Sequence, residues 1–172
     1  MFLFAEPTWA TMIAGGGILL LGEALRLWGV AIAGSETRTT GPVGGSFLVT
    51  TGPFAYIRNP LYLGNLLIYA GFGVMSNALF PWLPLLALIF FYVQYSLIVS
   101  LEESYLFATY GQEYARYRSS VYRFIPKLVR YVPGNNPQPS LDWADGFRSE
   151  RRTLQALVLV VVALVLLWLA QG

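Results

Sequence analysis

The stretch NPLYLGNLLIYAGFGVMSNALFPWLPLLALIFFYVQYSLIVSL, residues 59–101, carries no charged side chain. A membrane-spanning helix needs about 20 mostly apolar residues to cross a hydrocarbon core of roughly 30 Å, so this stretch is long enough to cross twice. A Ser-Asn pair at 76–77 and prolines at 81 and 84 interrupt it, and such residues favour a turn. We therefore expect an antiparallel hairpin of two spanning helices, residues 61–77 and 82–100.

Two more apolar stretches, residues 8–33 and 153–170, flank this hairpin. Of all residues, 56% are hydrophobic and 12% are charged, which is about half the charged fraction of a typical soluble domain. No Lys or Arg precedes the first apolar stretch, so we expect a retained helix there rather than a cleaved signal peptide. The sequence thus predicts an all-α, polytopic membrane protein with about four transmembrane helices, in a single domain of residues 1–172.

The first apolar stretch carries two further signals. Gly15, Gly22 and Gly29 recur every seven residues, which places them on one helix face where small residues allow close packing in lipid. Glu23 and Arg26 are three residues apart and can pair. Such charges are either an internal ion pair or site residues facing a cavity; the pattern favours the ion pair.

The basic residues predict the orientation. With four spans, residues 34–60 and 101–152 lie on the same side, and these segments hold every Lys and Arg except Arg26. The positive-inside rule places both segments in the cytoplasm and both termini on the opposite side. Within them we expect turns at 41–45 and 51–53, a helix at 102–118, a loop at 133–139, and an interfacial segment around Trp143 and Phe147.

The residue types that are missing exclude several chemistries. The chain has no Cys and no His, which removes disulfides, thiol nucleophiles, imidazole bases and the usual zinc ligands. No metal site is therefore predicted. A net charge of +2 is too small to indicate nucleic-acid binding.

Arg58 and the residues after it form the first cluster with chemical potential, at the start of the second span. Pro60 suits the first turn of a helix, where its missing N–H would be unpaired in any case. Arg58 would then lie at a helix N-terminus, whose free N–H groups can bind an anion. The alternative is an arginine that reaches up to headgroup phosphates.

The second cluster is Gly71-Phe72-Gly73. Helical spacing puts Gly64 and Gly71 on one face, and Tyr62, Tyr69 and Gly73 on the other. One face can therefore serve helix packing while the other lines a cleft with polar groups. Helix packing is the default explanation for such glycines.

The third cluster is Glu102-Glu103, where the third span leaves the membrane. Adjacent helical residues point about 100° apart, so the two carboxylates cannot converge on one atom. A solvated acidic pair is the alternative interpretation. The hairpin, however, brings Arg58 beside this pair, and a cation with carboxylates is what a small zwitterion needs.

In this order the clusters resemble the integral membrane methyltransferases, the group that includes isoprenylcysteine carboxyl methyltransferase and phosphatidylethanolamine N-methyltransferase. The resemblance rests on TGPFAYIRNPLYLGN (51–65), Gly71-Phe72-Gly73 and EESYLFATYGQEY (102–114), and it continues through Tyr117, Val121 and RFIP (123–126). The core signature therefore covers residues 51–126. The family often has His at the position of Asn59 and Pro at that of Tyr122.

The resemblance implies a pocket for S-adenosylmethionine in the cytoplasmic helical and loop segments, and a lipid or lipid-like methyl acceptor that enters from the membrane. It implies catalytic roles for Glu103 and Arg58. The residues it implies around the cofactor are Arg58, Asn59, Pro60, Tyr62, Gly64, Gly71, Gly73, Glu102 and Glu103. From the opposed charges we expect Glu102 or Glu103 to hold the cofactor ammonium, and Arg58 or nearby N–H groups its carboxylate.

The sequence leaves the acceptor and the oligomeric state open. A carboxylate acceptor needs no base at pH 7, whereas an amine with a pKa near ~10 must first lose a proton. We favour N-methylation of a phospholipid amine, with carboxyl O-methylation as in isoprenylcysteine enzymes as the alternative. More distant alternatives are an NADPH-dependent membrane reductase, since sterol reductases share a similar Arg-X-Pro-X-Tyr-X-Gly pattern, and a non-enzymatic membrane scaffold.

Overall fold

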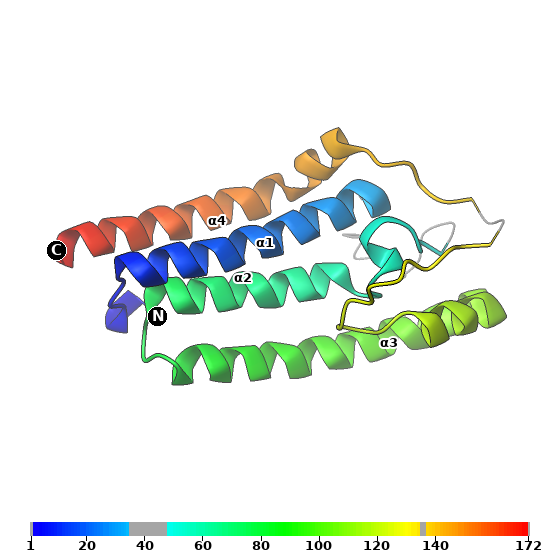
Figure 1. Ribbon diagram of the computed structural model, residues 1–172, viewed down its shortest axis with the longest axis horizontal. Coiled ribbons are helices and arrows are strands. Elements are labelled where there is room, and N and C mark those ends of the chain that lie inside the picture. The colour runs from blue at the N-terminus through cyan, green and yellow to red at the C-terminus, as the bar shows by residue number, and fades with distance from the viewer. Residues whose placement is uncertain (1, 35–47, 135–136, 172) are drawn as a thin grey trace.

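Four long helices dominate the computed structural model, which describes residues 2–34, 48–134 and 137–171. All regular elements within these ranges are helical, so the all-α prediction is confirmed. The helices lie side by side in the order α4, α1, α2, α3 (Figure 1). Their bounds are α1 (Trp9–Ala33), α2 (Pro60–Ser76), α3 (Trp82–Ser120) and α4 (Trp143–Gln171).

The lengths of these helices suit a membrane protein. By length and composition, α1, α3 and α4 can each cross a bilayer. Helix α2 has 17 residues, or about 25 Å at 1.5 Å per residue, which is the lower end of the spanning range. Both termini lie at one end of the bundle (Figure 1), where the Gln171 side chain donates a hydrogen bond to the Ala5 carbonyl over 3.0 Å.

Helices α1 and α2 pack through the predicted glycine face. A Cβ atom at Gly22 would lie 2.7 Å from the Gly64 carbonyl oxygen, and one at Gly71 would lie 2.7 Å from the Gly15 carbonyl oxygen. Nothing larger than hydrogen fits at such distances, so the two backbones touch. This contact fixes the start of α2 against α1.

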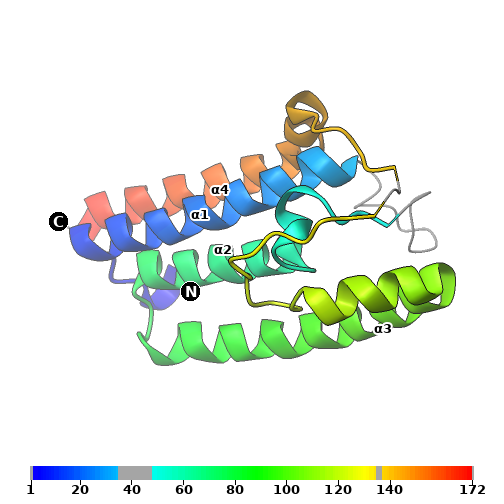
Figure 2. The same ribbon diagram turned by 45° about the vertical axis from the view of Figure 1, so that its right-hand side comes forward.

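Helix α3 changes direction at Gly111. Its backbone has φ 49° there, a conformation that glycine adopts without steric cost. Residues 112–120, which we call the return limb, fold back beside residues 101–110 (Figure 2). A continuous helix would separate residues 103 and 118 by about 22 Å, yet their side chains lie 4.0 Å apart. The predicted helix 102–118 is therefore two helical limbs.

The segments at the opposite end from the termini, which we call the loop end, are tied together by backbone hydrogen bonds. The short 3-10 helix η3 (Gly52–Ala55) occupies the turn expected at 51–53. The N–H groups of Lys127 and Tyr131 donate to the carbonyls of Tyr56 and Ala55 over 2.8 and 2.9 Å. The turn expected at 41–45 lies outside the described residues.

Helix α4 begins earlier than the predicted span. The sequence led us to expect a membrane helix at 153–170, whereas α4 begins at Trp143. The Asp142 carboxylate accepts a hydrogen bond from the Asp145 N–H over 3.0 Å, which is the contact of a helix N-cap. The expected interfacial segment around Trp143 and Phe147 is thus the first part of this helix.

Candidate functional site

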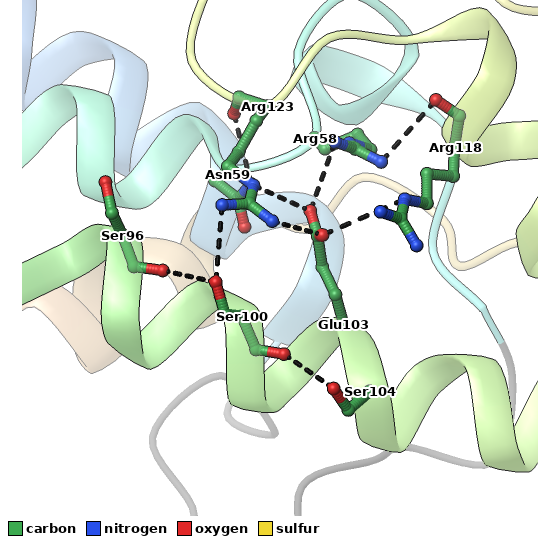
Figure 3. Close-up of polar contacts among 8 residues, drawn as sticks. All are labelled: Arg58, Asn59, Ser96, Ser100, Glu103, Ser104, Arg118 and Arg123. Atoms are coloured by element: carbon green, nitrogen blue, oxygen red, sulfur yellow. Dashed lines mark hydrogen bonds and ion pairs between the residues drawn. The ribbon is translucent and has the colours of Figure 1, made fainter.

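Glu103 is the centre of a cluster of arginines at the loop end. Its side chain is almost fully buried at 5% exposure. Arg123 donates to both carboxylate oxygens, from Nε over 3.1 Å and from Nη2 over 2.6 Å. Arg58 Nη2 lies 3.1 Å from one of these oxygens, and Arg118 Nε lies 4.0 Å from the other. Figure 3 shows the three guanidinium groups around this one carboxylate.

Three separate segments bring these arginines together. Arg58 comes just before α2, and its N–H donates to the Tyr122 carbonyl over 2.9 Å. The Asn59 side chain donates to the Arg123 carbonyl over 3.0 Å, which holds the segment after α3 against the start of α2 (Figure 3). Arg118 reaches Glu103 because Gly111 turns the return limb back. The expected meeting of Arg58 with the acidic pair therefore occurs, directly with Glu103.

The cluster has a surplus of positive charge. Three guanidinium groups surround one carboxylate, and the hydrogen bonds to Glu103 raise the pKa of Arg123 above its ordinary value. The Arg58 Nε atom is buried and makes no hydrogen bond within the described residues. The arrangement is suited to an additional anion, since guanidinium groups bind carboxylates and phosphates with paired N–H donors.

Glu102 has different surroundings from its neighbour. It accepts a hydrogen bond from the Tyr62 hydroxyl over 2.6 Å, and within the described residues it makes no ion pair with a cation. The ring of Tyr62 lies 4.8 Å from that of Tyr95, between α2 and α3. The two adjacent carboxylates thus have separate partners, one neutral and one cationic, as their helical divergence predicts.

The predicted glycines lie in helix contacts. Gly64 and Gly71 face α1, and a Cβ atom at Gly73 would lie 2.7 Å from the Cβ of Pro84 on α3. Pro60 is the first residue of α2, as expected. Packing explains these glycines, and contact of Gly64, Gly71 and Gly73 with a cofactor stays a prediction.

A cavity of about 380 Å³ opens at the loop end, lined in part by Thr50, Glu113, Arg116 and Tyr131. None of its lining residues belongs to the predicted site. The prediction of a cofactor pocket formed by the predicted residues therefore stays a prediction.

Sequence reasoning from the residues missed Arg118 and Arg123 as members of the cluster. Arg123 appeared only inside the family resemblance, and Arg118 had no assigned role. The sequence feature that could have placed them is Gly111, a single glycine inside a polar helical stretch. Such a glycine can mark a turn. Once the chain turns there, residues 118 and 123 lie beside residue 103.

A second charged cluster joins all four helices. Arg26 on α1 donates to both carboxylate oxygens of Glu150 on α4 over 2.9 and 3.0 Å, and its Nε lies 3.8 Å from Glu23. It also donates to the Asn65 side-chain oxygen on α2. Asn65 in turn donates to the Tyr95 hydroxyl on α3 over 3.1 Å. The internal ion pair predicted for Glu23 and Arg26 is present, and Glu150 extends it.

Metal ligands do not cluster in the part of the chain that the structure describes. In residues 2–34, 48–134 and 137–171, no three His, Cys, Asp or Glu side chains form a group that could hold a metal ion.

Comparison with known proteins identifies the class. The model of the phospholipid methyltransferase family matches residues 10–113, and the chain belongs to this family. A relative in Cupriavidus metallidurans, the cobalt-zinc-cadmium resistance protein CzcN, is 34% identical over 107 residues, which are 62% of this chain and 44% of the relative. The chain thus spans less than half of that relative's length, and no solved structure matches it.

Proposed function

We propose that the protein is an S-adenosylmethionine-dependent methyltransferase that modifies a lipid or lipid-like acceptor in the membrane. The observation that carries the proposal is the opposed charge at the loop end. A cationic cluster centred on Glu103 lies next to Glu102, a carboxylate held by the neutral Tyr62 hydroxyl. An amino-acid group with a carboxylate and an ammonium is complementary to this pair of sites. Membership of the family supports the same chemistry.

We assign the two ends of the cofactor's amino-acid group to different residues. Arg58, Arg118 and Arg123 have positive charge in excess of Glu103, and Arg58 Nε is buried with no hydrogen bond among the described residues. These residues fit the carboxylate. The N-terminus of α2, which has no side-chain cap, adds a partial positive charge close by. Glu102 fits the ammonium, because its described hydrogen-bond partner is a neutral hydroxyl.

Glu103 then has a positioning role. Both of its carboxylate oxygens already accept hydrogen bonds from Arg123. One of them also pairs with Arg58 and the other with Arg118, so guanidinium groups occupy the positions that an acceptor would need. We therefore propose that Glu103 orients Arg58 and Arg123 rather than serving as a general base.

The cofactor supplies an activated methyl group when it is bound. The residues of this chain then contribute mainly by holding the reactants in line, an effect that can supply about 7–11 kcal/mol. For the acceptor we propose a phospholipid amine, in keeping with the family's description, with carboxyl methylation as the alternative. We also propose that the loop end faces the cytoplasm, since nearly all basic residues are in its segments.

The test combines turnover with binding. Purified protein in nanodiscs is given labelled S-adenosylmethionine and a lipid extract, and the labelled product is identified by mass spectrometry. We expect methylated phosphatidylethanolamine; a labelled prenylcysteine ester would select the carboxyl acceptor. Thermal stabilisation by NADPH and not by S-adenosylmethionine would contradict the proposal.

The variant Glu102→Gln tests the assignment of the ammonium site. Hydrogen bonds to charged groups contribute about 1.5–3 kcal/mol, so we expect the calorimetric Kd for S-adenosylmethionine to rise about 10- to 100-fold. The matched control is Glu6→Gln, because the Glu6 N–H donates to the carbonyl of Ser76, the last residue of α2, far from the loop end. Equal affinity of Glu102→Gln and the control would remove Glu102 from the site.

A further inference from the structure

An ordered segment after the return limb presents aliphatic side chains outward. Residues 124–132, which we call the wedge, are held by the backbone hydrogen bonds from Lys127 and Tyr131 to the segment before α2. The Tyr131 ring packs inward, 5.2 Å from Tyr117. The exposed fractions of the outward residues are 70% for Ile125, 99% for Leu128, 69% for Val129 and 78% for Val132. A fixed backbone with this much exposed aliphatic surface marks an interaction site.

The wedge lies at the depth of the apolar part of α3. The ring of Phe124 is 5.6 Å from that of Tyr92, and Tyr92 belongs to the charge-free run of residues 59–101. Arg123, just before the wedge, donates to the Ser100 hydroxyl over 3.4 Å. In Figures 1 and 2 the yellow segment that follows α3 begins beside the helices and then runs out past the loop-end ends of α1 and α2. The start of the wedge therefore reaches back along the membrane-spanning part of the chain.

Basic side chains accompany the exposed aliphatic ones. Arg130 is exposed within the wedge, and Arg148, Arg151 and Arg152 are exposed near the start of α4. Lys127 is half-buried, and its Nζ donates to the Ser120 carbonyl over 3.1 Å. Trp143 and Phe147 are exposed in that part of α4, at 45% and 53%. Aromatic and basic residues of this kind are enriched at the level of the lipid headgroups, and Lys or Arg near an anionic leaflet is attracted to it.

We infer that the wedge is a membrane-inserted element that binds the anionic leaflet at the loop end. Ile125, Leu128 and Val129 enter the boundary between headgroups and acyl chains, while Arg130 contacts lipid phosphates. This arrangement matches that of interfacial elements with apolar and basic faces. It concerns a surface outside the proposed cofactor site and does not depend on the methyl-transfer chemistry.

Site-directed spin labelling tests the inference on the full chain. The chain has no Cys, so Leu128→Cys and the control Ser119→Cys each give a single labelling site without removal of native thiols. Ser119 is exposed on the return limb. In nanodiscs of phosphatidylcholine with phosphatidylglycerol, we expect the label at 128 to collide with lipid-dissolved oxygen several-fold more than with a water-soluble nickel chelate. We expect the reverse at 119.

Each other outcome overturns part or all of the inference. Equal nickel access at 128 and 119 would mean that the wedge is in water. Protection of position 128 from both probes would mean that protein covers it. If the label at 128 lies at the same depth in pure phosphatidylcholine as in the anionic mixture, the proposed contact of Arg130 with anionic lipid would be contradicted. Because the probes report the environment of the label and not turnover, failure of the proposed enzyme activity leaves this result interpretable.

Discussion

The two charged clusters of this bundle use the same groups in opposite proportions. At the loop end, Arg58, Arg118 and Arg123 surround Glu103. Between α1 and α4, the carboxylates of Glu23 and Glu150 share Arg26. Among the described residues, the first cluster has three arginines for one glutamate, and the second has one arginine for two glutamates.

The clusters also differ in their access to solvent. The side chain of Arg118 is 54% exposed, so water and solutes reach one side of the Glu103 cluster. Glu150 is fully buried, and Arg26 is 11% exposed. A buried ion pair is costly to form and is destabilising to break, and such a pair fixes which helix faces meet. We therefore interpret the Arg26 cluster as a clamp that orients α4 and the Glu103 cluster as the part that meets a ligand.

The largest effect is expected from Arg26→Met. The substitution removes the guanidinium group that pairs with two buried carboxylates, and breaking a buried pair typically costs about 3–5 kcal/mol. We expect the unfolding midpoint in detergent to fall by about 10 °C or more. In the control, Glu23→Leu and Glu150→Leu are added to Arg26→Met, and most of the loss should be recovered because the two carboxylates that paired with Arg26 are removed with it. A midpoint unchanged by Arg26→Met alone would mean that the cluster is not a clamp.

The next largest loss of stability is expected from Glu103→Gln, which leaves the three arginines without their carboxylate. We expect a loss of about 3 kcal/mol, and part of it should return when sulfate is added, since the anion can replace the lost charge. Thermal unfolding over a sulfate titration measures this. The Arg26→Met variant is the comparison, because it removes a cation from its cluster, whereas Glu103→Gln removes an anion. If sulfate stabilised both variants equally, the contrast between the clusters would not hold.

The sequence predicted the parts of the fold that depend on local composition. The charge-free run of residues 59–101 predicted the α2–α3 hairpin, and Gly15, Gly22 and Gly29 predicted the face of α1 that meets α2. The continuity of α4 was missed, because the charged residues between 148 and 152 separate the expected interfacial segment from the apolar span. One of these charges, Glu150, is paired with Arg26, a residue far away in the chain.

In the candidate site, too, only the contact that follows from the order of the helices was predicted. The meeting of Arg58 with Glu103 followed from the hairpin alone, since the two residues flank its ends. Arg118 and Arg123 could not be placed, because their positions depend on one backbone conformation at Gly111. A single positive φ reverses the direction of the chain without changing its composition.

The smallest loss of stability is expected from Gly64→Ala. This variant tests whether Gly64 belongs to the Arg26 cluster or to the ligand site. The family resemblance implies that Gly64 contacts the cofactor, whereas the structure places it beside the clamp. A Cβ atom there would lie 2.5 Å from Arg26 Cγ and 2.8 Å from the Gly22 carbonyl oxygen. Forcing a methyl group into such a contact costs about 1–3 kcal/mol, so the unfolding midpoint should fall by less than with Arg26→Met.

Two controls separate packing from cofactor binding at this position. Gly16→Ala adds a methyl group with nothing within 4 Å and should be neutral or slightly stabilising, because alanine favours a helix over glycine. Gly71→Ala places a methyl group 2.7 Å from the Gly15 carbonyl oxygen in the same helix contact. If Gly64 only packs, Gly64→Ala and Gly71→Ala should alter the Kd for S-adenosylmethionine in proportion to their loss of stability. A loss of affinity in Gly64→Ala well beyond that proportion would assign Gly64 to the ligand site and join the two clusters functionally.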